Sequence, residues 1–157
     1  MAEIDFLSVE DVLQIHASTM EQEGGLAGVR DHGLLDAAVA MPRQQFGGLF
    51  LHEDQAAMAA AYLFHLAKNH PFQDGNKRTA VMAAFVFLES NGIELTAPPS
   101  QLEAVTLQVA AGELSKDALT TWMRRQISGK PGRPSKRSRR GRTKLTDGRT
   151  AVRPYGE

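Results

Sequence analysis

The stretch NHPFQDGNKRTAV, residues 69–81, gathers side chains that accept protons, bind metals and bind anions at the point where the chain turns into a helix. Gly75 and Asn76 are expected to begin that helix, where unpaired backbone N–H groups and the helix dipole attract anions. Lys77 and Arg78 in the first turn should cost the helix a few tenths of a kcal/mol up to ~1 kcal/mol. Two cations beside free N–H groups therefore favour a bound phosphate, which Arg78 can hold with two parallel N–H groups.

A proton acceptor and a metal ligand precede this phosphate cradle. His70, fixed by the Pro71 turn, carries an imidazole, a common general base for a hydroxyl. Asp74 is suited to a Mg²⁺ ion that bridges phosphates. Base, metal ligand and cradle are what phosphoryl or nucleotidyl transfer needs, because its catalysis is mostly positioning and charge neutralisation. A plainer interpretation stays open: Asp74 caps the helix, His70 caps the preceding one, and both cations are solvated.

The elements around this segment are predicted to be helices, which makes the class all-α. Ser8 and Asp11 form the pattern of a capping box, Asp31 suits an N-cap, and residues 53–69 are rich in Ala and Leu without a breaker. We expect a compact bundle with a central buried helix, a short flap and a basic C-terminal tail. The expected helices run from Ser8 to about residue 23, from Asp31 to Pro42, over 53–69, from Gly75 to Asn91, and about Ser100 to Ala111 and Ser115 to Ile127.

Two short segments interrupt the helical pattern. Residues 44–50, QQFGGLF, place aromatic residues around a Gly-Gly pair and fit either a hairpin-like flap or a plain loop. A flap with Phe46 and Phe50 would clamp a target chain by strand pairing, and packing under a loop is the alternative. Residues 93–97, IELTA, are the one segment that we expect to form a strand.

Composition and charge divide the chain into a body and a tail. Residues 1–128 carry 8 Lys and Arg against 16 Asp and Glu, whereas residues 129–157 carry 10 against 2. The body, residues 1–128, has the size of one domain, and the tail has too few large apolar residues to fold alone, so we expect it to be disordered. The tail fits non-specific RNA or DNA contact, folding back on the acidic body, or no specific role.

Other function classes are excluded by what the sequence lacks. There is no cysteine, so disulfides, thiolate zinc sites and cysteine nucleophiles are ruled out. No stretch approaches the roughly 18 unbroken apolar residues of a membrane span, and the acidic first residues do not fit a signal peptide. We expect no membrane contact and a cytoplasmic location.

The motif HPFQDGNKRTA, residues 70–80, resembles the signature of the Fic/Doc family. The Fic branch of that family has H-P-F-x-x-G-N-G-R-x-x-R, and the Doc (death-on-curing) branch has H-x-F-x-D-A-N-K-R-T-A. After the Asn this chain follows Doc, since Lys77 replaces the Fic Gly and Val81 replaces the second Fic Arg. Pro71 and Gly75 are Fic-like departures from the Doc pattern. Segments outside the motif, including residues 24–44, extend the resemblance over about residues 6–127.

The resemblance implies roles for individual residues. His70, Asp74 and Arg78 would be catalytic, with His70 as base for the target hydroxyl and Asp74 as the Mg²⁺ ligand. Nucleotide and phosphate binding would fall to Phe72, Gly75, Asn76, Lys77 and Arg78. The cofactors would be ATP and Mg²⁺.

The resemblance also implies an activity, with one alternative. Fic enzymes transfer AMP to a protein, whereas in the Doc branch the nucleotide is reversed and the γ-phosphate goes to a threonine of elongation factor Tu, which stops translation. Lys77 favours the reversed nucleotide, because a long charged side chain in place of Gly should crowd a diphosphate tail. We therefore predict a Doc-type toxin with protein kinase activity, and AMP transfer is the nearest rival. A rival of another class is a non-catalytic nucleic-acid-binding or regulatory adaptor.

Restraint of such a toxin is implied to come from a separate antitoxin, whose C-terminal helix lies in a groove of the toxin. The chain also contains TMEQEG, residues 19–24, which matches the inhibitory motif [ST]-x-x-x-E-[GN] of self-restrained Fic proteins. In those proteins the glutamate pairs with the second Arg, whose place here is taken by Val81. For Glu23 we therefore expect the simpler case, a helix end with solvated acids.

Overall fold

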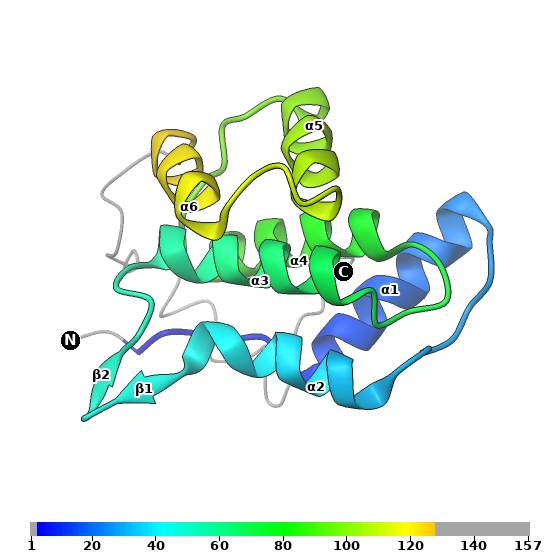
Figure 1. Cartoon of the computed structure of the whole chain (residues 1–157), viewed down its shortest axis with the longest axis horizontal. Helices are drawn as coiled ribbons and strands as arrows, with labels where there is room; N and C mark the ends of the chain where they lie inside the picture. The colour runs from blue at the N-terminus through cyan, green and yellow to red at the C-terminus, as the bar shows by residue number, and fades with distance from the viewer. Residues whose placement is uncertain (1–2, 128–157) are drawn as a thin grey trace.

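The computed structural model describes residues 3–127, and the basic tail lies outside these residues. The described chain is a bundle of helices with one small hairpin (Figure 1), as the all-α prediction requires. The elements are α1 (Val9–Glu23), α2 (His32–Ala40), a 3₁₀ turn η1 (Met41–Arg43), β1 (Gln45–Phe46), β2 (Leu49–Phe50), α3 (Gln55–Asn69), α4 (Asn76–Ser90), α5 (Pro99–Ala110) and α6 (Lys116–Arg125). No helix within this range is long and apolar enough to cross a membrane.

The helix starts follow the capping signals of the sequence. The Ser8 hydroxyl accepts a hydrogen bond from the Asp11 N–H at 3.0 Å, and an Asp11 carboxylate oxygen accepts one from the Ser8 N–H at 2.9 Å. This confirms the capping box at the start of α1. Asp31 caps α2 as predicted, and Asp54 caps α3, so α3 begins two residues later than the expected residue 53.

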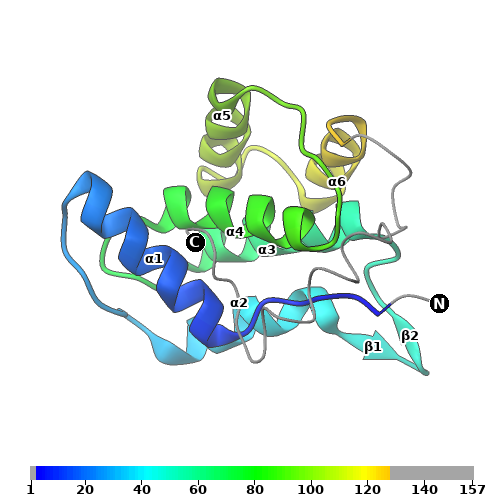
Figure 2. The same cartoon turned by 180° about the vertical axis from the view of Figure 1, so that it is seen from behind.

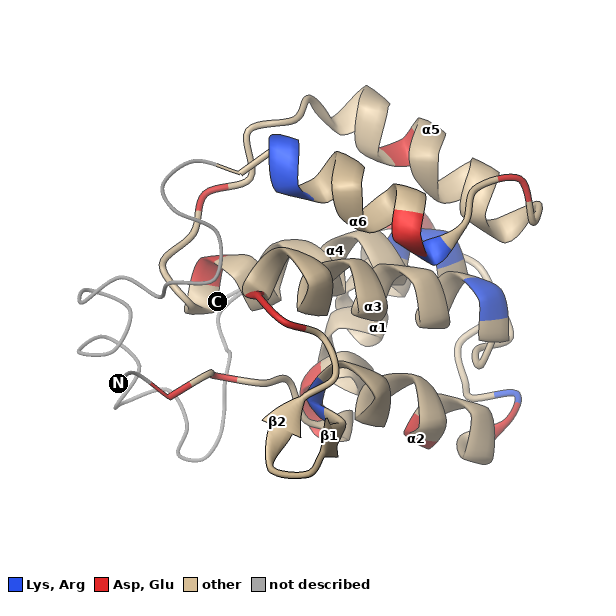
Figure 3. Ribbon diagram, turned by 60° about the vertical axis from the view of Figure 1, so that its left-hand side comes forward, with Lys and Arg blue, Asp and Glu red and all other residues tan. Residues whose placement is uncertain are grey.

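The core is built around α3 and α4, which lie side by side through the middle of the bundle (Figures 1 and 2). α1 packs on α4 and α2 on α3, while α5 and α6 cover the other side. The α3 ribbon bears charge only near its end, at Lys68 (Figure 3). Its fully buried alanines let neighbouring helices approach closely, and its buried Tyr62 hydroxyl accepts a hydrogen bond from the Leu7 N–H at 2.9 Å.

The strand predictions need one correction. Residues 44–51 contain an antiparallel hairpin, in which Gln45 pairs with Phe50 and Phe46 with Leu49, so the flap-like alternative is the right one. The strand expected over residues 93–97 is wrong, because within residues 3–127 that segment makes a single bridge, Leu95 with Ile127. Next to this bridge, the Thr96 N–H donates to the Gln126 carbonyl at 2.6 Å, just after the end of α6.

Candidate active site

The loop between α3 and α4 begins and ends in left-handed backbone. α3 ends at Asn69 and is followed by His70 with φ 50° and ψ 56°, and α4 begins at Asn76 behind Gly75 with φ 77°. Within residues 3–127, His70 is the one residue other than glycine with positive φ. A non-glycine residue in this region is uncommon and needs contacts that hold it there.

The contacts of His70 define which ring nitrogen carries the proton. Its Nδ1 lies 2.9 Å from the carbonyl oxygen of Ala67. Because a carbonyl only accepts, Nδ1–H is the donor, and the lone pair of the neutral ring is on Nε2. The side chain is exposed, so Nε2 is open to a hydroxyl that enters from solvent. This is the form of the ring that a general base requires.

Asn76 contributes its backbone to the site and uses its side chain to close the loop. Its Oδ1 accepts a hydrogen bond from the Phe72 N–H at 2.9 Å, and its Nδ2 donates one to the Phe72 carbonyl at 3.0 Å. The side-chain amide is therefore already satisfied. No side chain caps the start of α4, so the N–H groups of its first turn remain available to an anion.

Phe72 is placed in the core rather than among the anion-binding groups. Its ring is 1% exposed and stacks on His16 at 3.8 Å between ring centroids. The sequence resemblance put Phe72 with the nucleotide-binding residues, but the described fold gives its ring no access to a ligand. Its contribution is to anchor the loop, through its backbone bonds with Asn76.

Asp74 is exposed and held by the backbone around it. One carboxylate oxygen accepts a hydrogen bond from the Leu26 N–H at 3.2 Å, the other accepts one from the Gly75 N–H at 3.2 Å, and the Asp74 carbonyl lies 2.8 Å from His16 Nε2. Each carboxylate oxygen keeps a lone pair for a metal ion. The described residues contain no group of three or more His, Cys, Asp or Glu suited to a metal. A single carboxylate with free lone pairs has the donor chemistry that suits Mg²⁺, which is usually bound through one or two carboxylates together with water and phosphate oxygens.

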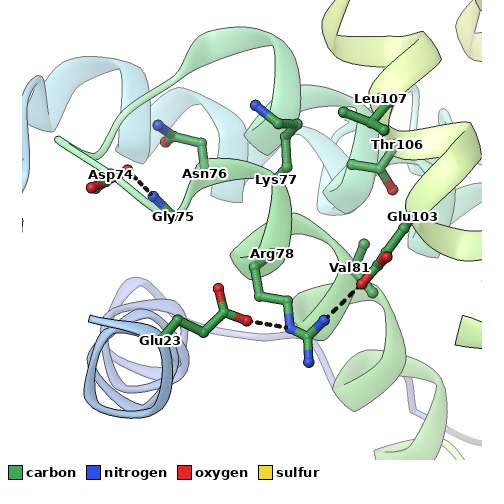
Figure 4. Close-up of a pocket in the computed structure, with 10 residues that line it drawn as sticks. All are labelled: Glu23, Asp74, Gly75, Asn76, Lys77, Arg78, Val81, Glu103, Thr106 and Leu107. Carbon is green, nitrogen blue, oxygen red and sulfur yellow. Dashed lines mark hydrogen bonds and ion pairs between the residues drawn. The ribbon is translucent and has the colours of Figure 1, made fainter. Parts of the chain in front are cut away.

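A cavity of about 350 Å³ lies over the start of α4. The loop and the first turn line it with the predicted residues Asp74, Gly75, Asn76, Lys77 and Arg78 (Figure 4). His70, at the other end of the loop, is outside this lining. The opposite wall comes from α5, which the sequence did not suggest, through Glu103, Thr106 and Leu107.

Arg78 is held between two carboxylates at the floor of this cavity. Its Nε is 3.2 Å from a Glu23 carboxylate oxygen, and its Nη1 is 3.0 Å from one of Glu103 (Figure 4). The expectation that Glu23 is merely solvated is wrong, because the last turn of α1 brings it over the phosphate cradle. Its partner is Arg78 itself, while Val81 occupies the position of the second Fic Arg and also lines the cavity.

Replacing Glu23 by Gln should make the cavity a better anion site. The Arg78 side chain is 40% exposed and that of Glu23 is 44% exposed, and such pairs contribute up to ~1 kcal/mol. We therefore expect phosphate or ATP to bind about two- to five-fold more tightly to the variant, as measured by calorimetry. Glu21→Gln is the matched control, since it removes the same charge from α1 at a residue whose side chain has no hydrogen bond or ion pair in the described chain. Equal or weaker binding by Glu23→Gln would contradict a competing role for Glu23.

Position 75 requires glycine for two reasons, the left-handed backbone and the closeness of the Met20 side chain. A Cβ at this position would overlap Met20 Cε, whereas one at Gly47, which also has a positive φ of 60°, would meet nothing within 4 Å. Gly47→Ala should thus cost about 1–2 kcal/mol for the positive φ alone. Gly75→Ala should cost about 1 kcal/mol more, because Met20 has to move. Urea denaturation of both variants tests this, and equal losses of unfolding free energy would show that the Met20 contact has no effect.

Burial near Lys116 shifts the pKa values of His52 and His65. Burial, and then the charge of Lys116, lower the pKa of His65 to about 4, and its Nε2 accepts a hydrogen bond from the Lys116 ammonium at 3.0 Å. The same two causes lower the pKa of His52. His65 is therefore a neutral, hydrogen-bonded helix residue, as its apolar surroundings in the sequence suggested.

The hairpin carries large apolar side chains on its surface. Phe46 is 81% exposed and Leu49 is 75% exposed. Phe50 is 37% exposed and its ring lies 5.5 Å from that of Phe6. Phe46 and Leu49 are therefore open to another chain, while Phe50 joins the hairpin to the body.

Comparison with known proteins agrees with this arrangement. The model of the Fic/DOC family matches residues 6–88. The chain is 46% identical over 93 residues to a protein named Toxin Doc from Mycolicibacterium smegmatis, a match that covers 59% of this chain and 69% of that protein. It is 31% identical over 119 residues to Protein kinase doc of Escherichia phage P1, which covers 76% of this chain and 93% of that protein.

The residues of the motif thus lie together on the helical bundle, with an exposed His70 and Asp74 on one loop and a Lys-Arg pair in the uncapped helix start that follows. The chain belongs to the Fic/Doc family, and its motif and relatives place it with the Doc-type members.

Proposed function

We propose that this protein is the toxin of a toxin–antitoxin module and transfers the γ-phosphate of ATP to a hydroxyl of a target protein. The observation that carries the proposal is the pairing of an exposed His70 Nε2 with the uncapped start of α4 on a single loop. The names of the relatives, Toxin Doc and Protein kinase doc, support the same activity. Residues 1–128 would form the catalytic domain.

In the proposed reaction His70 Nε2 takes the proton of the target hydroxyl. The hydroxyl oxygen then forms a bond to the γ-phosphorus of ATP, and the bond from that phosphorus to the bridging oxygen breaks. ADP leaves with the bonding electrons. The Nδ1–H bond to Ala67 supports this step, because it holds the lone pair on the nitrogen that faces solvent.

The phosphate groups would be bound by the first turn of α4. The N–H groups of Asn76 and Lys77 and the guanidinium of Arg78 supply donors and positive charge, and Gly75 lets a phosphate come close to the backbone. Asp74 would hold Mg²⁺, which neutralises phosphate charge when bound. The two carboxylates contact Nε and Nη1 of Arg78, so Nη2 can donate to a phosphate directly, whereas a phosphate bound through Nε or Nη1 would have to compete with Glu23 or Glu103.

AMP transfer to a protein is the second candidate. Pro71 and Gly75 favour it, since they follow the Fic pattern. Val81 opposes it, because a valine offers no charge to a γ-phosphate on that side of the cavity. Lys77 adds a long charged side chain to the same cavity, where it would crowd the diphosphate tail of a nucleotide bound for AMP transfer. Transfer of the γ-phosphate therefore remains the better fit. The adaptor alternative is the weakest, because binding alone does not need a base, a carboxylate and a cradle together.

Elongation factor Tu is the proposed target, and an antitoxin is the proposed partner. The exposed hairpin residues Phe46 and Leu49 are suited to holding a target segment by strand pairing. An apolar groove of about 230 Å³ between α4 and α5, lined by Phe85 and Leu102 among others, reaches Arg78 and would suit an antitoxin helix. Residues 129–157, outside the described range, would add non-specific contact with nucleic acid through their charge.

A cell-free translation extract tests the function and the target together. The protein, added with ATP and Mg²⁺, should stop peptide synthesis, and fresh elongation factor Tu added after removal of the protein should restore it. A His70→Ala variant should leave synthesis unchanged. Arrest that fresh elongation factor Tu does not relieve would contradict the target, and arrest by the His70 variant would contradict the catalytic mechanism.

A further inference from the structure

A segment before α2, residues 24–31, runs along the loop that carries His70. Gly28 accepts a hydrogen bond from the Gln73 N–H at 3.0 Å, and Val29 forms an antiparallel bridge with Phe72. The N–H groups of Arg30 and Asp31 both donate to the Pro71 carbonyl, at 2.7 and 3.0 Å. The loop is therefore held from outside by backbone contacts.

Arg30 adds its side chain to these contacts at the position of the proposed base. Its Nε–H donates to the His70 carbonyl at 2.8 Å, and its Nη2–H donates to the Asn69 carbonyl at 3.0 Å. These carbonyls belong to the last residue of α3 and to the residue that follows it, where the helix dipole favours a cation and where intrahelical donors are absent. One guanidinium thus joins two consecutive peptide groups at the end of α3.

The backbone that Arg30 holds is the left-handed one at His70. The direction of the imidazole depends on that backbone, because the Nδ1–H bond to Ala67 forms only while His70 turns back over the last turn of α3. If the His70 peptide rotates toward an ordinary conformation, this bond is lost and the proton is free to move to Nε2. The ring would then present a donor where a base is needed.

We propose that Arg30 is a positioning residue for His70: by binding the His70 and Asn69 carbonyls, it keeps the imidazole in the Nδ1–H form with Nε2 facing the target hydroxyl. The inference rests on the proposed function for its catalytic consequence. Arg30 does not line the phosphate cavity, so its removal should leave nucleotide binding intact. The proposal therefore assigns different roles to the two ends of the loop: Arg30 positions the base at the His70 end, and the phosphate cradle lies at the Gly75 end.

The test compares Arg30→Gln with Arg125→Gln in the full chain. Arg125 is exposed, and its side chain makes no hydrogen bond or ion pair in the part of the chain that the structure describes, so Arg125→Gln removes the same charge as Arg30→Gln without removing a contact. Two quantities are measured. The first is the tautomer of His70 by ¹⁵N NMR of the ring nitrogens, assigned with His70→Asn. The second is kcat and KM for ATP in phosphate transfer to elongation factor Tu.

We expect Arg30→Gln to lose the Nδ1–H signature of His70 and to lower kcat about 10- to 100-fold, with KM for ATP within about two-fold of the wild-type value. Arg30→Lys, which keeps the charge and one donor, should recover part of both, and it serves as the test variant if Arg30→Gln does not fold. Arg125→Gln should match the wild type.

The outcomes distinguish this inference from the proposed function. Wild-type kcat and tautomer in Arg30→Gln would overturn the inference and leave the function standing. A fall in kcat with an unchanged tautomer would also overturn it. A tautomer change in a protein whose wild type transfers no phosphate would support the positioning role and contradict the proposed function alone.

Discussion

His70→Asn is expected to lower the rate of phosphate transfer by about 10²–10⁴-fold, the usual contribution of a general base. Asn is preferred to Ala here because Asn tolerates left-handed backbone, so the loop should keep its shape. Asn cannot take the proton of the target hydroxyl, and ATP binding should persist because the cradle at the start of α4 is intact. The measurement is single-turnover transfer from ATP together with ATP affinity.

His32→Asn is the matched control for this variant. His32 is exposed in the first turn of α2, and its side chain makes no hydrogen bond within residues 3–127. Its replacement should leave the transfer rate unchanged. A His70→Asn variant that transfers phosphate at the wild-type rate would remove the histidine from the mechanism and would leave the exposed Nε2 without a role.

Arg78→Gln is expected to have the second-largest effect, this time on nucleotide binding. Hydrogen bonds to charged groups contribute about 1.5–3 kcal/mol, so loss of the guanidinium should raise KM for ATP about 10- to 100-fold. Arg78→Lys should recover part of this affinity, because it keeps the charge but not the two parallel donors. Steady-state kinetics over a range of ATP concentrations gives both values.

The stability of the Arg78 variants separates binding from folding. Its two ion pairs involve side chains that are 40–56% exposed, so their loss should change the free energy of unfolding by less than about 1 kcal/mol. A large loss of stability would mean that Arg78 serves the fold through Glu23 and Glu103. An unchanged KM with full stability would place the phosphate elsewhere.

The parts of the site that the sequence predicted are those set by local chemistry. The capping box of Ser8 and Asp11, the cap at Asp31 and the start of α4 at Asn76 each depend on a few neighbouring residues, so their patterns are visible in the chain. The short spacing of His70, Asp74 and Arg78 likewise predicted that one loop and the helix start after it would carry all three residues. The hairpin at residues 44–51 stayed open because Gly-Gly fits both a turn and a loop.

The parts that the sequence did not predict depend on long-range packing. Glu103 comes from α5 and Glu23 from α1, and only the fold brings them to Arg78. Arg30 lies 40 residues before His70, and nothing in its neighbourhood signals the carbonyls that it binds. Phe72 was assigned to the ligand from a motif, which records that a residue is present but not whether it faces the cavity or the core.

The central claim is that the group transferred is the γ-phosphate and that His70 takes the proton. The most direct measurement is transfer of radiolabel to purified elongation factor Tu from ATP labelled at either the α or the γ phosphate, with His70→Asn as the blank. Label from the γ position alone, absent with the variant, is the predicted result. Label from the α position would make the protein an AMP transferase, and label from neither position would contradict both the activity and the target.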